Sequence, residues 1–177
     1  MEKTSVLIVI LGIAIFVAAI TRFAVKNKIN ANAHFDEMQL QNRATGYKLG
    51  FMVTIACMLV VLFLMDDFVG LSSFVEPSLA IFIALMIGIV TFAIYCIRKE
   101  AFFRVGDKGT SYIVLCTVIF LMNGILSSLR IFDGTILENG RITFEHGGGL
   151  VCSVSFLMIL ITLIMKKKQI QRAEEEE

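Results

Sequence analysis

Residues 79–97 read LAIFIALMIGIVTFAIYCI, nineteen residues without a single charge. An α-helix rises about 1.5 Å per residue, so this run nearly covers the ~30 Å hydrocarbon core of a bilayer. The bilayer core holds no water, and a helix satisfies its own backbone groups there. The run also lacks the apolar–polar alternation of strands in a membrane barrel. It therefore predicts a transmembrane helix.

Four other apolar runs of similar length also contain no charge. The chain of 177 residues is 57% hydrophobic and 18% charged, with a mean hydropathy of +0.82, whereas soluble domains are about 25% charged. With their polar flanks, the predicted spans cover about residues 5–21, 47–65, 78–97, 111–129 and 149–165. The sequence predicts an all-α membrane protein, a five-span transmembrane helical bundle that forms a single integral membrane domain over residues 1–177.

The first apolar run, Val6–Ile20, also has the length of a cleaved signal peptide. The charges around it favour a retained helix. Glu2 and Lys3 cancel before the run, whereas Arg22 and Lys26 follow it. This order places the N-terminus outside the cell.

Basic residues gather in three segments. Thirteen of the 16 Lys and Arg residues lie in residues 22–48, 98–110 and 166–177, and the others are Lys3, Arg130 and Arg141. Five spans place these three segments on one side of the membrane. By the positive-inside rule that side is the cytoplasm, so residues 166–177 form a cytoplasmic charged tail.

Residues 130–148 contain the strongest turn signal of the chain, Asn139-Gly140, whose two positions tolerate positive φ. The segment therefore predicts a small external β-hairpin. Pairing across a two-residue turn produces the cross-strand pairs Glu138–Arg141, Leu137–Ile142, Ile136–Thr143 and Thr135–Phe144.

The polar residues of the spans concentrate in the outer half of residues 111–129. Asn123, Ser127 and Arg130 follow at helical spacing on one face, and Ser153 and Ser155 lie at a similar depth. One interpretation is an outward-facing polar pocket in which Arg130 holds an anionic group. The other, which we favour, is hydrogen bonding between helices, with Arg130 reaching the interface.

Small residues recur every four positions in two spans. Such stripes let another helix approach closely, either within the bundle or from a partner protein. The first stripe is Ala80, Ala84 and Gly88, and the second is Gly46, Gly50 and Thr54.

The chain lacks the residue patterns of common catalytic chemistries. No GxxxxGK[ST], HExxH or GxSxG run is present. No His, Asp or Glu lies inside a span, and the four Cys form no CxxC. His146 and the nearby acidic residues fit an ordinary external face as well as a cation site. We therefore expect no enzyme activity, no catalytic residue, no cofactor, no metal site and no nucleic-acid partner.

Residues 35–51, FDEMQLQNRATGYKLGF, lead into the second span. Asp36 is suited to cap a helix with Gln39 three residues later. Glu37 and Gln39 both precede Arg43, Gln39 by the four residues that make neighbours on a helix. Asp36, Glu37, Gln39 and Arg43 form a candidate face for a cytoplasmic partner.

The same stretch resembles a pattern in small, uncharacterised multi-pass membrane proteins, chiefly of Gram-positive bacteria. In those proteins Asp-Glu-(Arg or Met)-Gln, then Arg, then an aromatic residue and Gly or Ala lead into the second span. The matching positions are Asp36, Glu37, Met38, Gln39, Arg43, Tyr47, Gly50 and Phe51. The resemblance implies that the chain lies in the cytoplasmic membrane of a bacterium. It implies no particular activity.

These observations predict a non-enzymatic membrane protein, an accessory or interaction subunit whose partners are the lipid bilayer and a membrane protein or a second copy of the chain. Five spans are few for a transporter built from paired repeats. The alternative is a small oligomeric transporter or permease component in which the face of Asn123 and Arg130 lines a path. An enzyme acting on lipids is the third and least favoured interpretation.

Overall fold

The computed structural model describes residues 35–65, 70–103, 110–134, 137–138 and 140–175. The chain divides into two compact units, Met1–Glu37 and Met38–Glu177. Only residues 35–37 of the first unit are described, and the predicted first span, residues 5–21, lies outside the described residues. All described residues from Met38 onward belong to the second unit.

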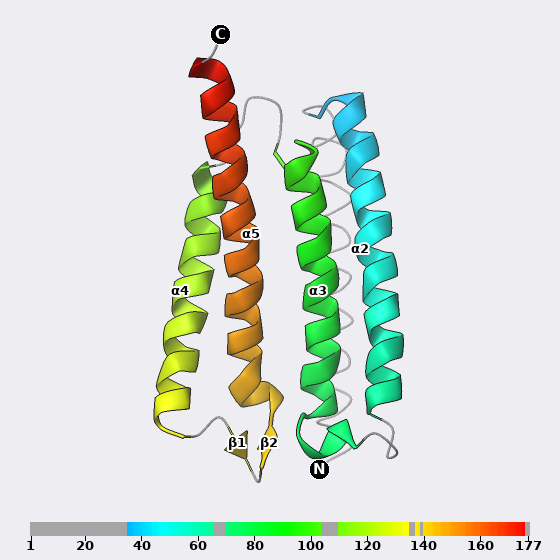
Figure 1. The fold of residues 1–177 in the computed structure, drawn as a ribbon, viewed down its shortest axis with the longest axis vertical. Helices are drawn as coiled ribbons and strands as arrows, with labels where there is room; N and C mark the ends of the chain where they lie inside the picture. Colours follow the sequence, from blue (N-terminus) through cyan, green and yellow to red (C-terminus); the bar gives the residue numbers. More distant parts are fainter. Residues whose placement is uncertain (1–34, 66–69, 104–109, 135–136, 139, 176–177) are drawn as a thin grey trace, which may run out of the picture. The chain divides into compact units, whose positions relative to one another are not determined.

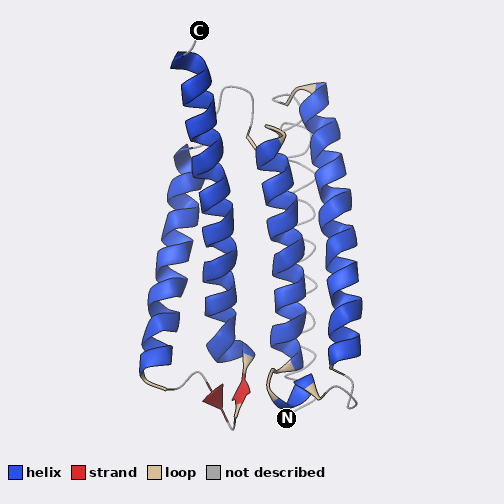
Figure 2. Ribbon diagram, viewed as in Figure 1, coloured by secondary structure: helices blue, strands red, loops and turns tan. Residues whose placement is uncertain are grey.

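Four long helices dominate this unit (Figures 1 and 2): α2 (Glu37–Leu64), α3 (Pro77–Arg98), α4 (Thr110–Phe132) and α5 (Phe144–Glu175). Each is long and apolar enough to cross a membrane. Even α3, with 22 residues, extends about 33 Å at 1.5 Å per residue. The prediction of an all-α fold is thus supported, with four helices among the described residues that are long and apolar enough to span a membrane.

The helix ends differ from the predicted spans. Helix α2 begins at Glu37 rather than near residue 47, and α5 runs from Phe144 to Glu175 rather than over about 149–165. Glu, Gln, Lys and Arg are good helix formers, so a helix continues into water after its apolar run has ended. The charged tail that was predicted from residue 166 is therefore helical as far as Glu175.

Helix α5 packs against both α3 and α4. Its buried residues Ile159, Leu160 and Leu163 form one apolar cluster with Cys116 of α4 and with Val90, Ala93 and Ile97 of α3. Apolar burial drives little association of helices inside lipid, so close van der Waals packing has to hold such a cluster together.

Helices α2 and α3 come closest to each other where both carry glycine residues. A Cβ atom added to Gly50 would lie 2.9 Å from the Gly88 carbonyl oxygen, and one added to Gly88 would lie 1.7 Å from Thr54 Oγ1. Tyr47 stacks on Phe92, with ring centroids 4.3 Å apart. The two predicted stripes of small residues therefore contact each other inside the protein, with Gly88 against Gly50 and Thr54. Ala80 and Ala84 of the first stripe are also buried.

Two short strands precede α5. Strand β1 (Leu137–Glu138) pairs antiparallel with β2 (Arg141–Ile142), with Leu137 opposite Ile142 and Glu138 opposite Arg141. This is the register expected from the sequence for these two pairs. Asn139, Thr135 and Ile136 lie outside the described residues.

The paired strands occupy much less than residues 130–148, because α4 continues to Phe132 and α5 begins at Phe144. The prediction that Phe144 belongs to a strand is therefore wrong. The reason is that a helix begins directly after Thr143. The Thr143 carbonyl oxygen accepts the Gly147 N–H, and Thr143 Oγ1 lies 2.7 Å from His146 Nδ1. Strand β2 is also hydrogen-bonded to the segment that follows the 3₁₀ helix η1 (Leu71–Ser73), since the Ile142 N–H donates to the Phe74 carbonyl.

Candidate functional site

Helix α3 ends in an unusual backbone conformation. Glu100 has φ +56° and is alone among the described non-glycine residues in having a positive φ. Its N–H donates to the Ile97 carbonyl, and the Ala101 N–H donates to the Cys96 carbonyl at 2.8 Å. Glycine usually occupies this left-handed position after a helix. A glutamate there costs about 1–2 kcal/mol, so its side chain is a candidate for a specific role.

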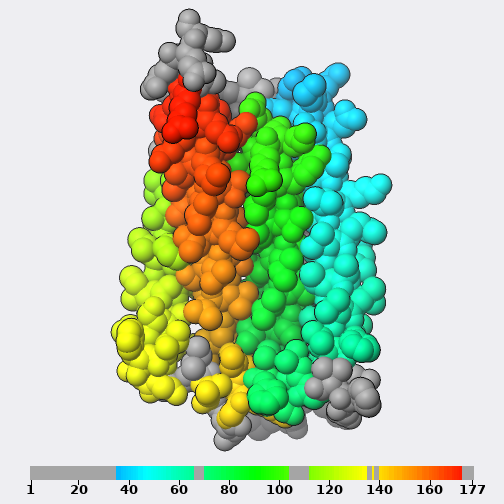
Figure 3. Space-filling model, in the orientation of Figure 1, coloured from blue at the N-terminus to red at the C-terminus, as the bar shows by residue number. Residues whose placement is uncertain are grey.

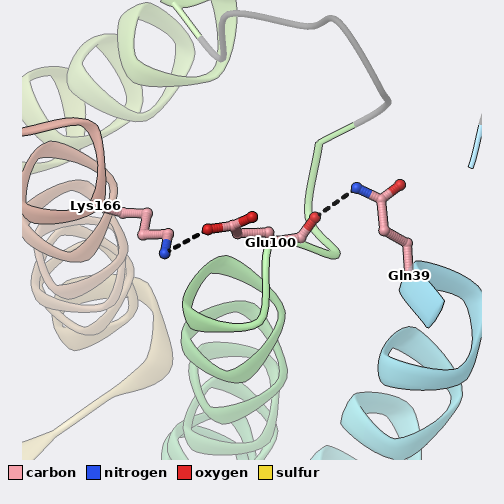
Figure 4. Close-up of polar contacts among 3 residues, drawn as sticks. All are labelled: Gln39, Glu100 and Lys166. Atoms are coloured by element: carbon pink, nitrogen blue, oxygen red, sulfur yellow. Dashed lines mark hydrogen bonds and ion pairs between the residues drawn. The ribbon is translucent and has the colours of Figure 1, made fainter. Parts of the chain in front are cut away.

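Glu100 connects three helices (Figure 4). Its Oε1 lies 2.7 Å from Lys166 Nζ of α5, and its carbonyl oxygen accepts a hydrogen bond of 2.8 Å from Gln39 Nε2 of α2. The Glu100 side chain is 64% exposed and that of Lys166 is 20% exposed. Water screens such a pair, which limits its contribution to about 0–1 kcal/mol. The two contacts therefore link α5 and the start of α2 to the end of α3 but add little stability.

The predicted partner face is partly engaged within the chain. The Gln39 side chain donates a hydrogen bond to the Glu100 carbonyl oxygen at the end of α3. Asp36 Oδ1 accepts the Glu37 N–H at 2.7 Å. Arg43 is half-buried and lies one turn before Gly46, which packs against Cys96. Asp36 and Glu37 are exposed.

Most residues of the predicted polar pocket lie between α4 and α5. Ser127 is 2% exposed and Ser153 is 6% exposed. The Ser153 hydroxyl donates to the Phe120 carbonyl across the two helices at 3.3 Å. Asn123 Nδ2 donates to the Ile119 carbonyl at 2.9 Å. Throughout the described residues every buried side-chain nitrogen and oxygen has a hydrogen-bond partner.

Ser155 and Arg130 are placed elsewhere. The Ser155 hydroxyl donates to the Val151 carbonyl of its own helix, and the residue lines a groove between α3 and α5. The Arg130 guanidinium donates to the Glu145 carbonyl oxygen and so ties the end of α4 to the first turn of α5. The five predicted residues therefore do not converge on one pocket.

Glu76 has a role that the sequence did not indicate. It is the N-cap residue of α3, and its Oε2 accepts the N–H of Phe144, the first residue of α5, at 2.7 Å. Hydrogen bonds from Ser78 and from the Phe144 N–H lower the pKa of the Glu76 carboxyl. One carboxylate thus joins the starts of two helices.

Metal ligands do not gather in the described part of the chain, where no three His, Cys, Asp or Glu side chains lie together. His146 contacts Thr143 instead. The comparisons with known proteins identify no relative: no family model, no curated protein and no solved structure matches the chain.

Proposed function

We propose that the chain is a non-enzymatic accessory or interaction subunit of a membrane complex in the cytoplasmic membrane of a bacterium. The observation that carries this proposal is the surface of α2. Of its 28 residues only Gly46 and Gly50 are buried. Large apolar side chains such as Phe51, Leu62 and Phe63 are exposed. This exposed apolar surface of α2 is suited to contact a helix of another membrane protein.

The alternative, a small transporter, has less support. A transport path needs polar groups that a solute can reach. Asn123, Ser153 and Ser155 instead donate hydrogen bonds to backbone carbonyls, and both serines are buried. Of these three bonds, that of Ser153 crosses between two helices. An interhelical hydrogen bond contributes about 0.6 kcal/mol, which suits a packing role.

We also propose five spans, with the N-terminus outside and the C-terminus in the cytoplasm. Arg98, Lys99 and Lys166 lie at one end of the helices, as the Glu100–Lys166 contact requires, and Arg130 lies with Glu145 at the other end. The larger group of described basic residues is thus at one end, which supports the orientation proposed from the positive-inside rule.

A photo-crosslinking side chain tests the subunit role. Placed at Phe63 of α2 in living cells, it is expected to yield one protein adduct of reproducible mass. The matched position is Met122 of α4, which is similarly exposed and is expected to yield mainly lipid adducts. Lipid adducts alone from both positions would count against the proposal.

Liposomes containing only the purified chain provide the second measurement. We expect no flux of K⁺, Na⁺, Cl⁻ or amino acids above that of empty liposomes. Saturable flux that Asn123→Leu removes from a folded protein would favour the transporter instead.

A further inference from the structure

Helix α3 borders an apolar groove that it shares with α5. The groove has a volume of about 400 Å³, and the two helices lie side by side along it (Figure 3). Its lining includes Ile87, Thr91 and Ile94 from α3 and Val154 and Met158 from α5. Nearly all of this lining is hydrocarbon, so the groove is suited to hold an alkyl chain.

A polar pocket lies between the first turns of α2 and the end of α3. Its volume is about 520 Å³. Glu100 lines it, but the Glu100 carboxylate is paired with Lys166 at 2.7 Å. The cations of Arg98 and Lys99 therefore give the pocket a net positive charge. The α2 side contributes neutral polar side chains, those of Gln41, Asn42 and Thr45.

The groove leads towards this pocket along one side of α3. Ile87, Thr91, Ile94 and Arg98 follow at spacings of four, three and four residues, so they share one helix face. The lining of the groove on α3 runs from Ile83 to Ile94, a rise of about 16 Å. One leaflet of the hydrocarbon core measures about 15 Å. Arg98 then lies one turn beyond it, at the depth of lipid headgroups.

We propose that this side of α3 binds an anionic glycerophospholipid. Its phosphate contacts Arg98 and Lys99, with the side-chain amides of Gln41 and Asn42 as further hydrogen-bond donors, and one acyl chain fills the groove. Guanidinium–phosphate hydrogen bonds are strong because both partners are charged. A phosphatidylcholine carries the same phosphate, but its own cation would meet Arg98 and Lys99. The site therefore discriminates by headgroup charge.

Native mass spectrometry of the full chain in detergent tests the headgroup. Phosphatidylglycerol and phosphatidylcholine with identical acyl chains are titrated separately. We expect phosphatidylglycerol to bind about tenfold more tightly. The double variant Arg98→Gln/Lys99→Gln should remove this preference. Lys167→Gln/Lys168→Gln, which changes two exposed lysines of α5, should retain it. Equal binding of the two lipids, or equal losses in both double variants, would overturn the proposal.

A second pair of variants tests the acyl chain. Val154→Trp fills the groove and should weaken phosphatidylglycerol binding about tenfold, whereas Val118→Trp, at a similarly exposed position of α4, should not. Glycerol phosphate and inorganic phosphate should bind far more weakly than the lipid. Unchanged binding in Val154→Trp, or glycerol phosphate binding as tightly as the lipid, would refute the lipid assignment. All of the substituted positions are exposed. Circular dichroism checks that each variant folds. If Arg98→Gln/Lys99→Gln does not fold, Lys99→Gln alone takes its place in the headgroup test.

Discussion

The carboxylate of Glu100 lies 2.7 Å from the ammonium of Lys166, although a left-handed backbone position such as that of Glu100 favours glycine. Two effects therefore oppose each other at this residue. The conformation costs about 1–2 kcal/mol, and the partly exposed ion pair returns at most about 1 kcal/mol.

Replacing Glu100 by glycine should therefore leave stability unchanged or raise it by up to about 1 kcal/mol. Glu100→Gln keeps the strain and loses the ion pair, so it should lower stability by less than about 1 kcal/mol. Denaturant titration in detergent, followed by circular dichroism, measures both effects. A loss above about 2 kcal/mol in Glu100→Gly would mean that the ion pair dominates.

Gly88 should not tolerate a larger residue. In Gly88→Ala the new Cβ would meet Thr54 Oγ1 at 1.7 Å and the Gly50 carbonyl oxygen at 2.9 Å. Helices α2 and α3 must then separate, at a cost of about 1–3 kcal/mol. Reduced crosslinking between α2 and α3, together with a lower melting temperature, would report this separation.

Gly148→Ala is the matched control for that substitution. The three atoms nearest to its Cβ would be ring carbons of Phe144, at 3.6 Å or more, and alanine favours a helix by about 0.5–1 kcal/mol. The variant should be neutral or more stable. If Gly88→Ala were equally well tolerated, the close contact between α2 and α3 would be wrong.

The sequence predicts some parts of this structure much better than others. Runs without charge, such as residues 79–97, locate helices α2 to α5 because a bilayer admits little else. Asn139-Gly140 predicts the register of Leu137 with Ile142 because turn chemistry is local. Contacts between distant residues have no such signal. Gln39 and Glu100 are 61 residues apart and Glu76 and Phe144 are 68 apart, and only the packed helices bring each pair together.

The orientation predicts which ends an impermeant thiol reagent reaches. In a chain whose native cysteines are replaced by serine or alanine, Arg141→Cys should be labelled in intact cells. Lys168→Cys, also at an exposed position, should be labelled only after lysis. The opposite pattern would invert the proposed topology, and labelling of both in intact cells would show that the two ends lie on the same side.

The Glu76 carboxylate should make the start of α5 sensitive to acid. Its pKa in the folded protein is lowered by hydrogen bonds from Ser78 and from the Phe144 N–H. A folded-state pKa below the unfolded one means that the unfolded chain binds the proton more readily. The contribution of Glu76 to stability is therefore complete above the ordinary pKa of about 4.5 and is lost as the pH falls through the lowered value.

Hydrogen exchange at the first amides of α5, measured between neutral and acidic pH, tests this expectation. Protection should fall in acid in the native chain. It should change less in Glu76→Gln, which keeps an acceptor oxygen for the Phe144 N–H but has no charge to titrate. Asp133→Asn, an exposed position after the end of α4, should keep the native response. If Glu76→Gln kept the full acid response, another group would have to titrate at this helix start.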